Sequence, residues 1–246
     1  HLCADRKEVE AELKRVILPD DFKAILTGFG RVGNGAREIL ALLPIKEVSA
    51  ADYLSQNFNG PVYTHLDTHH YFARITDAGF DKAEFYANPS IYQSTFEPFA
   101  NKSELYIPCH FWSAQSPKIL TRAMLVNQKS SLKVVADISC DINGPIACTI
   151  RPSKIDNAIY GYNPHTNQEV DFRHTEAIAV MAVDNLPCEL PKDASMDFGA
   201  ELLRHVFPVL LGPDPNQIID RASQTTSEGK LNAPFVYLQD FLEGKE

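Results

Sequence analysis

Residues 27–36 read TGFGRVGNGA, which places Gly28, Gly30 and Gly33 in the spacing GxGxxG. In dinucleotide-binding proteins this spacing has a mechanical basis. The first glycine makes a tight turn, the second lets a pyrophosphate approach the backbone, and the third lets helix and strand pack closely. The phosphates then lie on exposed N–H groups at the positive end of the following helix. The motif alone is weak evidence, so its context has to be tested.

The sequence on both sides of the glycines supplies that context. Residues 22–27 (FKAILT) form a short apolar run that is typical of a buried parallel strand. Residues 31–43 carry apolar side chains on one helical face and stop at Pro44, and residues 45–50 form a second short run. Strand, glycine turn, helix and strand within about 30 residues predict a βαβ unit. Dinucleotide binding is therefore favoured over a purely structural glycine turn.

The remaining elements alternate in the same way. Apolar runs predict strands at residues 105–112, 132–138 and 177–183, and helical patterns occur at residues 117–126, 193–211 and 234–242. Residues 57–100 are polar and aromatic, and we expect an irregular insertion that packs its own rings. The predicted fold class is α/β, with a Rossmann-like, doubly wound, mostly parallel sheet and flanking helices.

Composition excludes several classes of protein. The 246 residues carry 23 Lys and Arg against 32 Asp and Glu, a formal charge of −9, and 44% are hydrophobic. An acidic chain without a basic block argues against nucleic-acid binding. The apolar runs are too short for a membrane span. The five cysteines form no CxxC pair, which indicates reduced thiols and a cytoplasmic protein.

Three segments are predicted along the chain. The charged stretch at residues 1–18 predicts an inter-domain helix whose N-terminal cap is Asp5. Residues 19–212 form the dinucleotide-binding domain. Residues 213–246 form a tail and a helix that would return to a further domain.

The acidic residue that binds the adenosine ribose should follow the second strand, about 20 residues after the glycines. Asp52 is the nearest candidate, and it could equally cap a helix that starts at Tyr53. If Asp52 does not reach the ribose, Ser49 lies near the 2′ position and NADP is easier to accommodate. The cofactor is therefore NAD or NADP.

Two other clusters contain residues with suitable chemistry. Asp137, Ser139, Cys140 and Asp141 lie at the carboxyl end of the strand predicted at residues 132–138, where ligands of open parallel sheets bind. A carboxylate there could contact a substrate amine or orient a proton donor, or it could simply cap the turn. Cys140 has no base beside it in the sequence, which argues against a nucleophilic role.

The stretch HLDTHH at residues 65–70 superficially resembles a metal site. It lacks further ligands at a familiar spacing, so a solvated face is the better interpretation and no metal is expected.

Several motifs together resemble the saccharopine dehydrogenase and lysine-ketoglutarate reductase family, which is related to alanine dehydrogenase and the NAD(P) transhydrogenases. They are GFGRVGNGA, VVADISCDINGPI and MAVDNLPCELPKDAS, with an aromatic NPxxYxSxF stretch and a terminal GKLNAPFVYLQDFL. The resemblance runs from Phe22 to about Gly244. It implies hydride transfer between NAD(P) and the imine that links lysine to 2-oxoglutarate.

The resemblance also implies roles for individual residues. The implied cofactor contacts are Gly30, Arg31, Phe111, Ile138, Val183, Asp184, Asn185 and Leu186. The implied substrate contacts are Ser139, Cys140 and Asp141, with Asp141 the catalytic candidate.

The family's lysine and histidine acid–base pair lies in an N-terminal domain that nothing here matches, and the chain begins at His1 rather than Met. We therefore expect the C-terminal, nucleotide-binding part of a longer enzyme, inactive by itself. Its partners would be a small amino-acid substrate and an N-terminal substrate domain of the same polypeptide, and a homo-oligomer is compatible with the sequence. The alternatives are an alanine dehydrogenase-like enzyme and a non-catalytic dinucleotide-sensing module.

Overall fold

The computed structural model describes residues 2–127 and 129–245. The chain divides into two compact units, His1–Leu190 (unit 1) and Pro191–Glu246 (unit 2), which are described separately. The predicted segment boundaries at residues 18 and 212 remain predictions.

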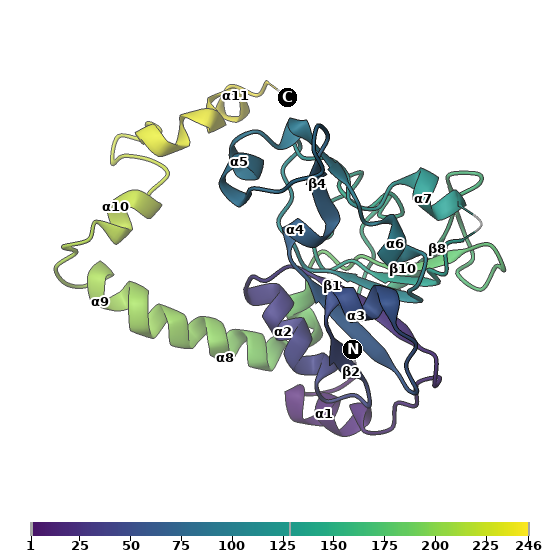
Figure 1. The fold of residues 1–246 in the computed structure, drawn as a ribbon. Helices are drawn as coiled ribbons and strands as arrows, with labels where there is room; N and C mark the ends of the chain where they lie inside the picture. Colours follow the sequence, from purple (N-terminus) through teal and green to yellow (C-terminus); the bar gives the residue numbers. More distant parts are fainter. Residues whose placement is uncertain (1, 128, 246) are drawn as a thin grey trace. The chain divides into compact units, whose positions relative to one another are not determined.

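Unit 1 is built on an eight-stranded sheet in the order β2-β3-β1-β6-β7-β10-β8-β9 (Figure 1). Six neighbouring strands from β2 to β10 are parallel, and β8 and β9 add an antiparallel hairpin at one edge. The predicted Rossmann-like, mostly parallel α/β fold is confirmed. The strands are β1 (Lys23–Thr27), β2 (Lys46–Val48), β3 (Val62–Leu66), β6 (Leu105–Pro108), β7 (Val134–Ala136), β8 (Ile159–Asn163), β9 (Gln168–Val170) and β10 (Ile178–Met181).

Short helices connect these strands. They are α1 (Arg6–Leu13), α2 (Arg31–Leu40), α3 (Ala50–Ser55), α4 (Thr68–Tyr71), α5 (Lys82–Ala87), α6 (Glu97–Ala100) and α7 (Arg122–Val126). The predicted cap of α1 is confirmed, because the Asp5 side chain accepts hydrogen bonds from the Lys7 and Glu8 N–H groups. Helix α7 is shorter than predicted. Residues before it are extended instead, since Leu120 pairs with Ile146.

The order of the strands differs from the simplest interpretation of the sequence. The chain passes from β1 through α2 to β2 at the sheet edge and then returns to β3, which pairs directly with β1. Strand β3 lies within residues 57–100, where we expected an irregular insertion, so that expectation was wrong for this part. All five residues of β3 are buried. Thr64 and His65 interrupt the apolar run that would otherwise have marked a central strand.

The rest of residues 67–100 is compact and aromatic. Strands β4 (Phe72–Arg74) and β5 (Tyr92–Ser94) form a separate two-stranded sheet beside α5. The Phe72 and Phe85 rings stack with centroids 4.8 Å apart, and Tyr92 meets Phe85 edge-on at 5.2 Å. The expectation that these rings pack together is confirmed, and they join the main core of unit 1.

The central sheet has apolar side chains packed on both faces. Along β1, Ile25 belongs to one buried cluster, whereas Ala24 and Leu26 belong to the other. This alternation is the geometry of a strand that is covered on both sides. The ends of the strands, not the faces, are therefore left for a ligand.

Unit 2 is a series of helices: α8 (Pro191–Glu201), a π-helical turn (Leu202–Val206), α9 (Phe207–Leu210), α10 (Ile218–Ala222), a 3-10 helix (Ala233–Leu238) and α11 (Gln239–Leu242). The predicted helices at residues 193–211 and 234–242 are thus confirmed in outline. The π turn precedes Pro208, which has no N–H to continue the regular pattern. Met196, Phe198, Leu203 and Leu211 are each at least 66% exposed, so unit 2 leaves apolar side chains uncovered.

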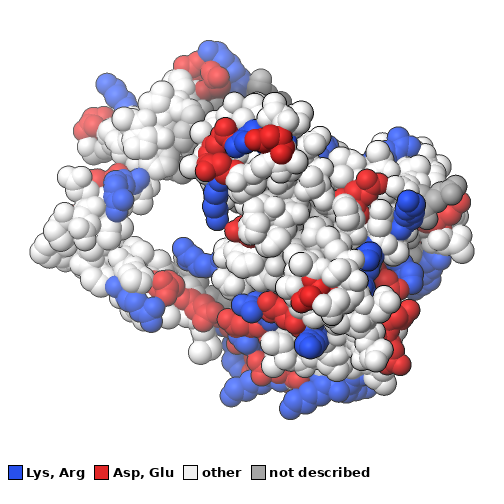
Figure 2. All heavy atoms as spheres, viewed as in Figure 1, with Lys and Arg blue, Asp and Glu red and all other residues white. Residues whose placement is uncertain are grey.

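The surface shows charges of both signs. Lys and Arg lie among Asp and Glu on the face of the molecule in Figure 2, and they alternate around α1. Arg6 of α1, for example, contacts Glu10 at 2.9 Å. Within residues 2–127 and 129–245, no helix is long and apolar enough to cross a membrane.

Candidate functional site

The carboxyl ends of the parallel strands meet at one edge of the sheet, and hydrogen bonds join the loops that follow them. The Gly28 N–H donates to the Leu66 carbonyl at the end of β3, and the Cys109 N–H donates to the Thr27 carbonyl at the end of β1. The Ile138 N–H after β7 donates to the Pro108 carbonyl at the end of β6. This edge is where open α/β sheets bind ligands, at the point where the strand order reverses beside β1.

The three glycines of the motif have three different surroundings. Gly28 has φ of +103°, and an added Cβ would lie 2.3 Å from the Cys109 carbonyl oxygen. A Cβ on Gly33 would lie 1.8 Å from the Gly28 carbonyl oxygen. A Cβ on Gly30 would meet nothing within 4 Å. Gly28 and Gly33 are therefore required by the fold, whereas Gly30 leaves open space in front of the N-terminus of α2.

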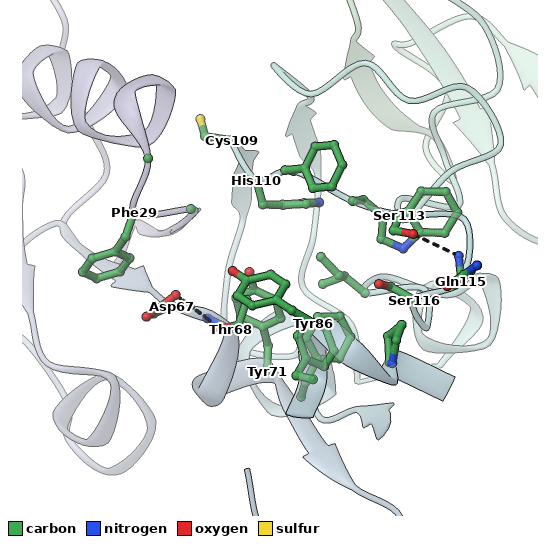
Figure 3. A pocket seen from close by; sticks show the side chains of 18 residues that line it. Phe29, Asp67, Thr68, Tyr71, Tyr86, Cys109, His110, Ser113, Gln115 and Ser116 are labelled. Atoms are coloured by element: carbon green, nitrogen blue, oxygen red, sulfur yellow. Dashed lines mark hydrogen bonds between the residues drawn. The ribbon is translucent and has the colours of Figure 1, made fainter. Parts of the chain in front are cut away.

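A cavity of about 480 Å³ adjoins the glycine turn. Gly28 and Gly30 form one side of it, and aromatic side chains from α4, α5 and the loop after β6 form the rest (Figure 3). The aromatic lining consists of Phe29, Tyr71, Phe72, Phe85, Tyr86, His110, Phe111 and Trp112. An apolar cavity with a few polar groups beside a phosphate-binding turn is typical of a nucleotide site.

Asp67 is the acidic residue at the end of the strand next to β1. It follows Leu66 directly and lines the cavity together with Gly28 and Gly30. Its Oδ1 accepts a hydrogen bond from the Thr68 N–H at 2.8 Å, and Oδ2 lies 3.5 Å from the Lys82 ammonium. Burial by itself would raise the pKa of Asp67, but the Thr68 N–H and the charge of Lys82 outweigh it and lower the pKa below its usual value. The carboxylate is therefore ionised at neutral pH.

Asp52 lies in a different part of the fold. It sits on α3, which follows the edge strand β2, and β3 separates β2 from β1. Its carboxylate accepts hydrogen bonds from the Ser49 hydroxyl at 2.8 Å and the Gln56 amide at 2.5 Å. The helix begins at Ala50, and its cap is Ser49 rather than Asp52. Strand β2 therefore does not adjoin β1, and of these two carboxylates it is Asp67 that lines the cavity, whereas Asp52 does not.

Asp137 organises the turn after β7. The side chain is fully buried, and its carboxylate accepts hydrogen bonds from the Ser139 N–H, the Ser139 hydroxyl, the Cys140 N–H and the Thr149 hydroxyl. These bonds hold Cys140 at φ +50°, which is uncommon for a residue with a side chain. Of the two carboxylates in this stretch, Asp137 is the one that builds the turn.

Asp141 carries the other carboxylate. Burial, followed by the nearby charge of Asp137, raises the pKa of Asp141 above its usual value. Burial likewise raises the pKa of the Cys140 thiol to about 11, and this thiol contacts the Ala182 carbonyl at 3.1 Å. Cys140 is therefore a protonated thiol at neutral pH, which argues against a nucleophilic role.

The other predicted site residues gather at the same edge of the sheet. Arg31 is the first residue of α2 and is exposed. Phe111 follows β6, lines the cavity and is 91% exposed. Ile138 follows β7, and Val183, Asp184, Asn185 and Leu186 follow β10. With the exception of Asp52, the structure brings the predicted residues to the ends of β1, β6, β7 and β10.

The histidine-rich stretch serves local structure. The His65 Nε2 lies 2.6 Å from the Gly28 carbonyl oxygen and supports the glycine turn. The His70 Nδ1 accepts a hydrogen bond from the Asp67 N–H. In the described residues, no group of three His, Cys, Asp or Glu side chains is placed to hold a metal ion.

Two contributions were missed at the level of sequence, those of Asp67 and His65. The available signal was an acidic residue, Asp67, directly after residues 62–66 (VYTHL). That stretch is recognised as a strand only if its polar residues, Thr64 and His65, are assumed to be buried. Their place beside β1 depends on the strand order, which the sequence does not express.

Comparisons with known proteins identify related sequences. Alpha-aminoadipic semialdehyde synthase of Arabidopsis thaliana is 32% identical to the chain over 197 residues, which are 71% of the chain and 18% of that protein. The mitochondrial alpha-aminoadipic semialdehyde synthase of Rattus norvegicus is 29% identical over 256 residues, covering 90% of the chain and 27% of that protein. The chain thus spans between 18% and 27% of the length of these relatives.

A smaller relative matches over a shorter range. Saccharopine dehydrogenase [NAD(+), L-lysine-forming] of Schizosaccharomyces pombe is 28% identical over 102 residues, which are 42% of the chain and 27% of that enzyme. No protein-family model matches the chain. On the strength of these relatives, the chain is a homologue of alpha-aminoadipic semialdehyde synthases and of saccharopine dehydrogenases.

Proposed function

We propose that the chain is the nucleotide-binding part of a saccharopine dehydrogenase-like oxidoreductase that uses NAD or NADP. The observation that carries the proposal is the open space at Gly30. A Cβ there would meet nothing within 4 Å, while both neighbouring motif glycines are tightly packed. The fold therefore leaves room where a pyrophosphate would approach the first turn of α2, whose N–H groups have no acceptor within the helix.

The residues around that space suit the rest of a dinucleotide. Asp67 lies at the end of β3 and can accept hydrogen bonds from the adenosine ribose. The loops after β7 and β10 lie on the other side of the reversal point, where the nicotinamide half would extend. Ile138 and Val183 through Leu186 would contact the ring there, and Ser139, Cys140 and Asp141 would face the substrate.

When bound, a reduced nicotinamide would donate a hydride to the imine that links lysine and 2-oxoglutarate, and in the reverse direction an oxidised nicotinamide would accept one from the secondary amine. The residues of this chain would orient the ring and exclude water. The raised pKa of Asp141 increases the fraction of its carboxyl that is protonated and able to move a proton at the substrate. Asp137 would act only by positioning this turn, since its carboxylate already accepts four hydrogen bonds.

Asp67 makes NAD the preferred cofactor in this proposal. An ionised carboxylate accepts hydrogen bonds from the 2′ and 3′ hydroxyls of NAD, but it repels the 2′-phosphate of NADP. We expect NADH to bind about tenfold or more tightly than NADPH in a titration followed by nicotinamide fluorescence. If the chain binds neither, the proposed function is wrong.

Asp67→Ala should reduce this preference and lower the affinity for NADH about tenfold, because the ribose hydroxyls lose a charged acceptor. Asp52→Ala is the matched control, since it removes a carboxylate that is bonded to Ser49 and Gln56 and does not line the cavity, and it should leave both affinities unchanged. If Asp52→Ala weakened binding and Asp67→Ala did not, the proposal that Asp67 binds the ribose would be wrong, and Asp52 would be the ribose-binding residue.

The remainder of the catalytic machinery would lie in an N-terminal substrate domain of the same polypeptide. The chain covers only 18% to 27% of its semialdehyde synthase relatives, and unit 2 leaves Phe198 and Leu203 exposed. We propose that such apolar side chains pack on other parts of the enzyme. A cytoplasmic location remains a prediction, because several relatives are mitochondrial proteins.

The 246-residue chain should bind dinucleotide without measurable oxidation of saccharopine. The physical reason is that a substrate with three carboxylates needs several Arg or Lys donors, whereas Arg151 already pairs with Glu169 at 2.6 Å. Incubation with saccharopine and NAD, followed at the absorbance of NADH, measures this directly. Sustained NADH production by the purified chain would contradict the proposal that the acid–base and substrate-binding residues lie in a separate N-terminal domain.

A further inference from the structure

His110 is the residue at the cavity whose hydrogen bonding is incomplete. It follows β6, and its Nδ1 lies 3.0 Å from the Thr27 Oγ1 at the end of β1. Its Nε2 is buried and has no hydrogen-bond partner among the described residues. A buried polar atom without a partner costs on the order of 1–3 kcal/mol. His110 is one of the residues that line the cavity, so a ligand bound there is a candidate partner for Nε2.

The hydrogen bonds from Tyr106 through Thr27 to the His110 ring determine which ring nitrogen carries the proton. The hydroxyl of fully buried Tyr106 lies 3.1 Å from the Thr27 Oγ1, its hydrogen-bond partner in the structure. A buried phenol must donate its one proton, so Tyr106 donates to Thr27. The Thr27 hydroxyl is then free to donate to the His110 Nδ1. With Nδ1 as an acceptor, the proton of the neutral ring resides on Nε2.

The ring also stays neutral under ordinary conditions. Burial lowers the pKa of His110 to about 4, so the imidazole carries a single proton at neutral pH. His110 therefore carries one uncharged N–H donor, at Nε2. A neutral donor suits a ring nitrogen or a carbonyl oxygen better than it suits a phosphate, which is bound more strongly by charged groups.

The shape of the cavity around His110 restricts the ligand further. In Figure 3 the His110 side chain lies between Tyr71 and Tyr86 on one side and the loop of Ser113 on the other. Tyr71, Tyr86 and Trp112 contribute flat apolar walls. Such walls favour stacking with a flat heteroaromatic ring. Asp67 and Gly30 line the same cavity, so a nucleotide held by its phosphates and ribose would place its base among these rings.

We propose that the His110 Nε2–H donates a hydrogen bond to a ring nitrogen of a purine base in this cavity, which makes His110 a specificity-determining residue for the base. The inference rests on the proposed dinucleotide binding and goes beyond it. The glycine turn and Asp67 hold the phosphates and ribose of any nucleotide, whereas a directed donor from His110 selects the base. The relay from Tyr106 through Thr27 fixes the ring in the donating state.

The test uses ADP and its 1-deaza, 3-deaza and 7-deaza analogues, each of which replaces one ring nitrogen by CH. In calorimetric titrations of the full chain, we expect one analogue to bind about tenfold more weakly than ADP, because it cannot accept the bond. His110→Phe keeps a flat ring without a donor. It should bind ADP about tenfold more weakly and lose the discrimination among the analogues.

Two further variants control for indirect effects. His110→Gln places an amide N–H near the position of Nε2 and should recover part of the affinity. His205→Phe removes an exposed histidine of unit 2 and should bind all four ligands as the wild type does. Equal binding of ADP and all three analogues by the wild type, with no loss in His110→Phe, would overturn the role of His110 and leave dinucleotide binding intact. Failure of the wild type to bind ADP and NADH would overturn both.

A measurement on the wild type alone avoids any dependence on the folding of variants. Nitrogen-15 NMR of the histidine rings distinguishes a protonated Nε2 from a protonated Nδ1. We expect His110 to carry its proton on Nε2 at neutral pH and the Nε2 resonance to shift on addition of ADP. A proton on Nδ1, or an Nε2 resonance that ADP leaves unchanged, would contradict the proposal.

Discussion

Gly30→Val is expected to lower the affinity for NADH by about 100-fold or more while leaving the fold intact. The isopropyl group would fill the space in front of the first turn of α2, where the pyrophosphate would otherwise approach the N–H groups. Stability should change little, because a Cβ at this position meets nothing within 4 Å and Gly30 has φ −79°, which valine adopts readily. Fluorescence titration and thermal unfolding measure the two effects separately.

The two glycines within α2, Gly33 and Gly35, serve as comparisons. Gly35 also has open space around a Cβ but lies within α2, so Gly35→Ala should bind normally and gain about 0.5–1 kcal/mol in stability. Gly33→Ala should instead destabilise the fold, since its Cβ would collide with the Gly28 carbonyl oxygen. If Gly30→Val retained wild-type affinity for NADH, the phosphates could not lie at this helix end, and the main support for the proposed function would be lost.

Asp137→Ala should reduce the free energy of unfolding by about 3–5 kcal/mol, the largest effect on stability that we expect from a single side chain. The substitution leaves the hydroxyls of Ser139 and Thr149 and two backbone N–H groups without their acceptor in a buried place. Cys140, whose φ is +50°, would also lose one of the bonds that hold it. Urea denaturation of the variant and the wild type measures the difference.

Two variants make this prediction specific. Asp137→Asn retains one carbonyl acceptor and should lose less stability than the alanine variant. Asp156→Ala removes an exposed carboxylate and should stay within about 0.5 kcal/mol of the wild type. An unfolding free energy for Asp137→Ala equal to that of Asp156→Ala would show that the turn after β7 does not depend on this carboxylate.

Much of the fold can be predicted from local patterns in the sequence. The apolar run before Gly28 and the amphipathic stretch after Gly30 gave β1 and α2, because a strand buried on both faces needs continuous apolar residues and a surface helix needs one apolar face. The same reasoning located β6, β7 and β10. Their loops were predicted to form the site, since the ends of parallel strands share one edge.

The patterns failed where polar residues are buried for tertiary reasons. Strand β3 contains Thr64 and His65, and the His65 ring is buried because it bonds to the Gly28 carbonyl, a contact between residues 37 positions apart. Local hydrophobic periodicity cannot predict a contact between residues so far apart in the chain. The same holds for the relay from Tyr106 to His110, which passes through Thr27 about 80 positions earlier in the chain.

The sequence by itself predicted the glycine turn, the α/β class, the family resemblance and the set of loops that gather at the candidate site. Only the tertiary structure decided that β3 rather than β2 lies beside β1, and with it that Asp67 rather than Asp52 lines the cavity. The physical reason is that strand order follows from how whole layers bury their apolar faces, whereas turns and helices follow from neighbouring residues. From the sequence alone, the positions in the sheet of a short edge strand such as β2 and of a central strand with two buried polar side chains such as β3 cannot be told apart.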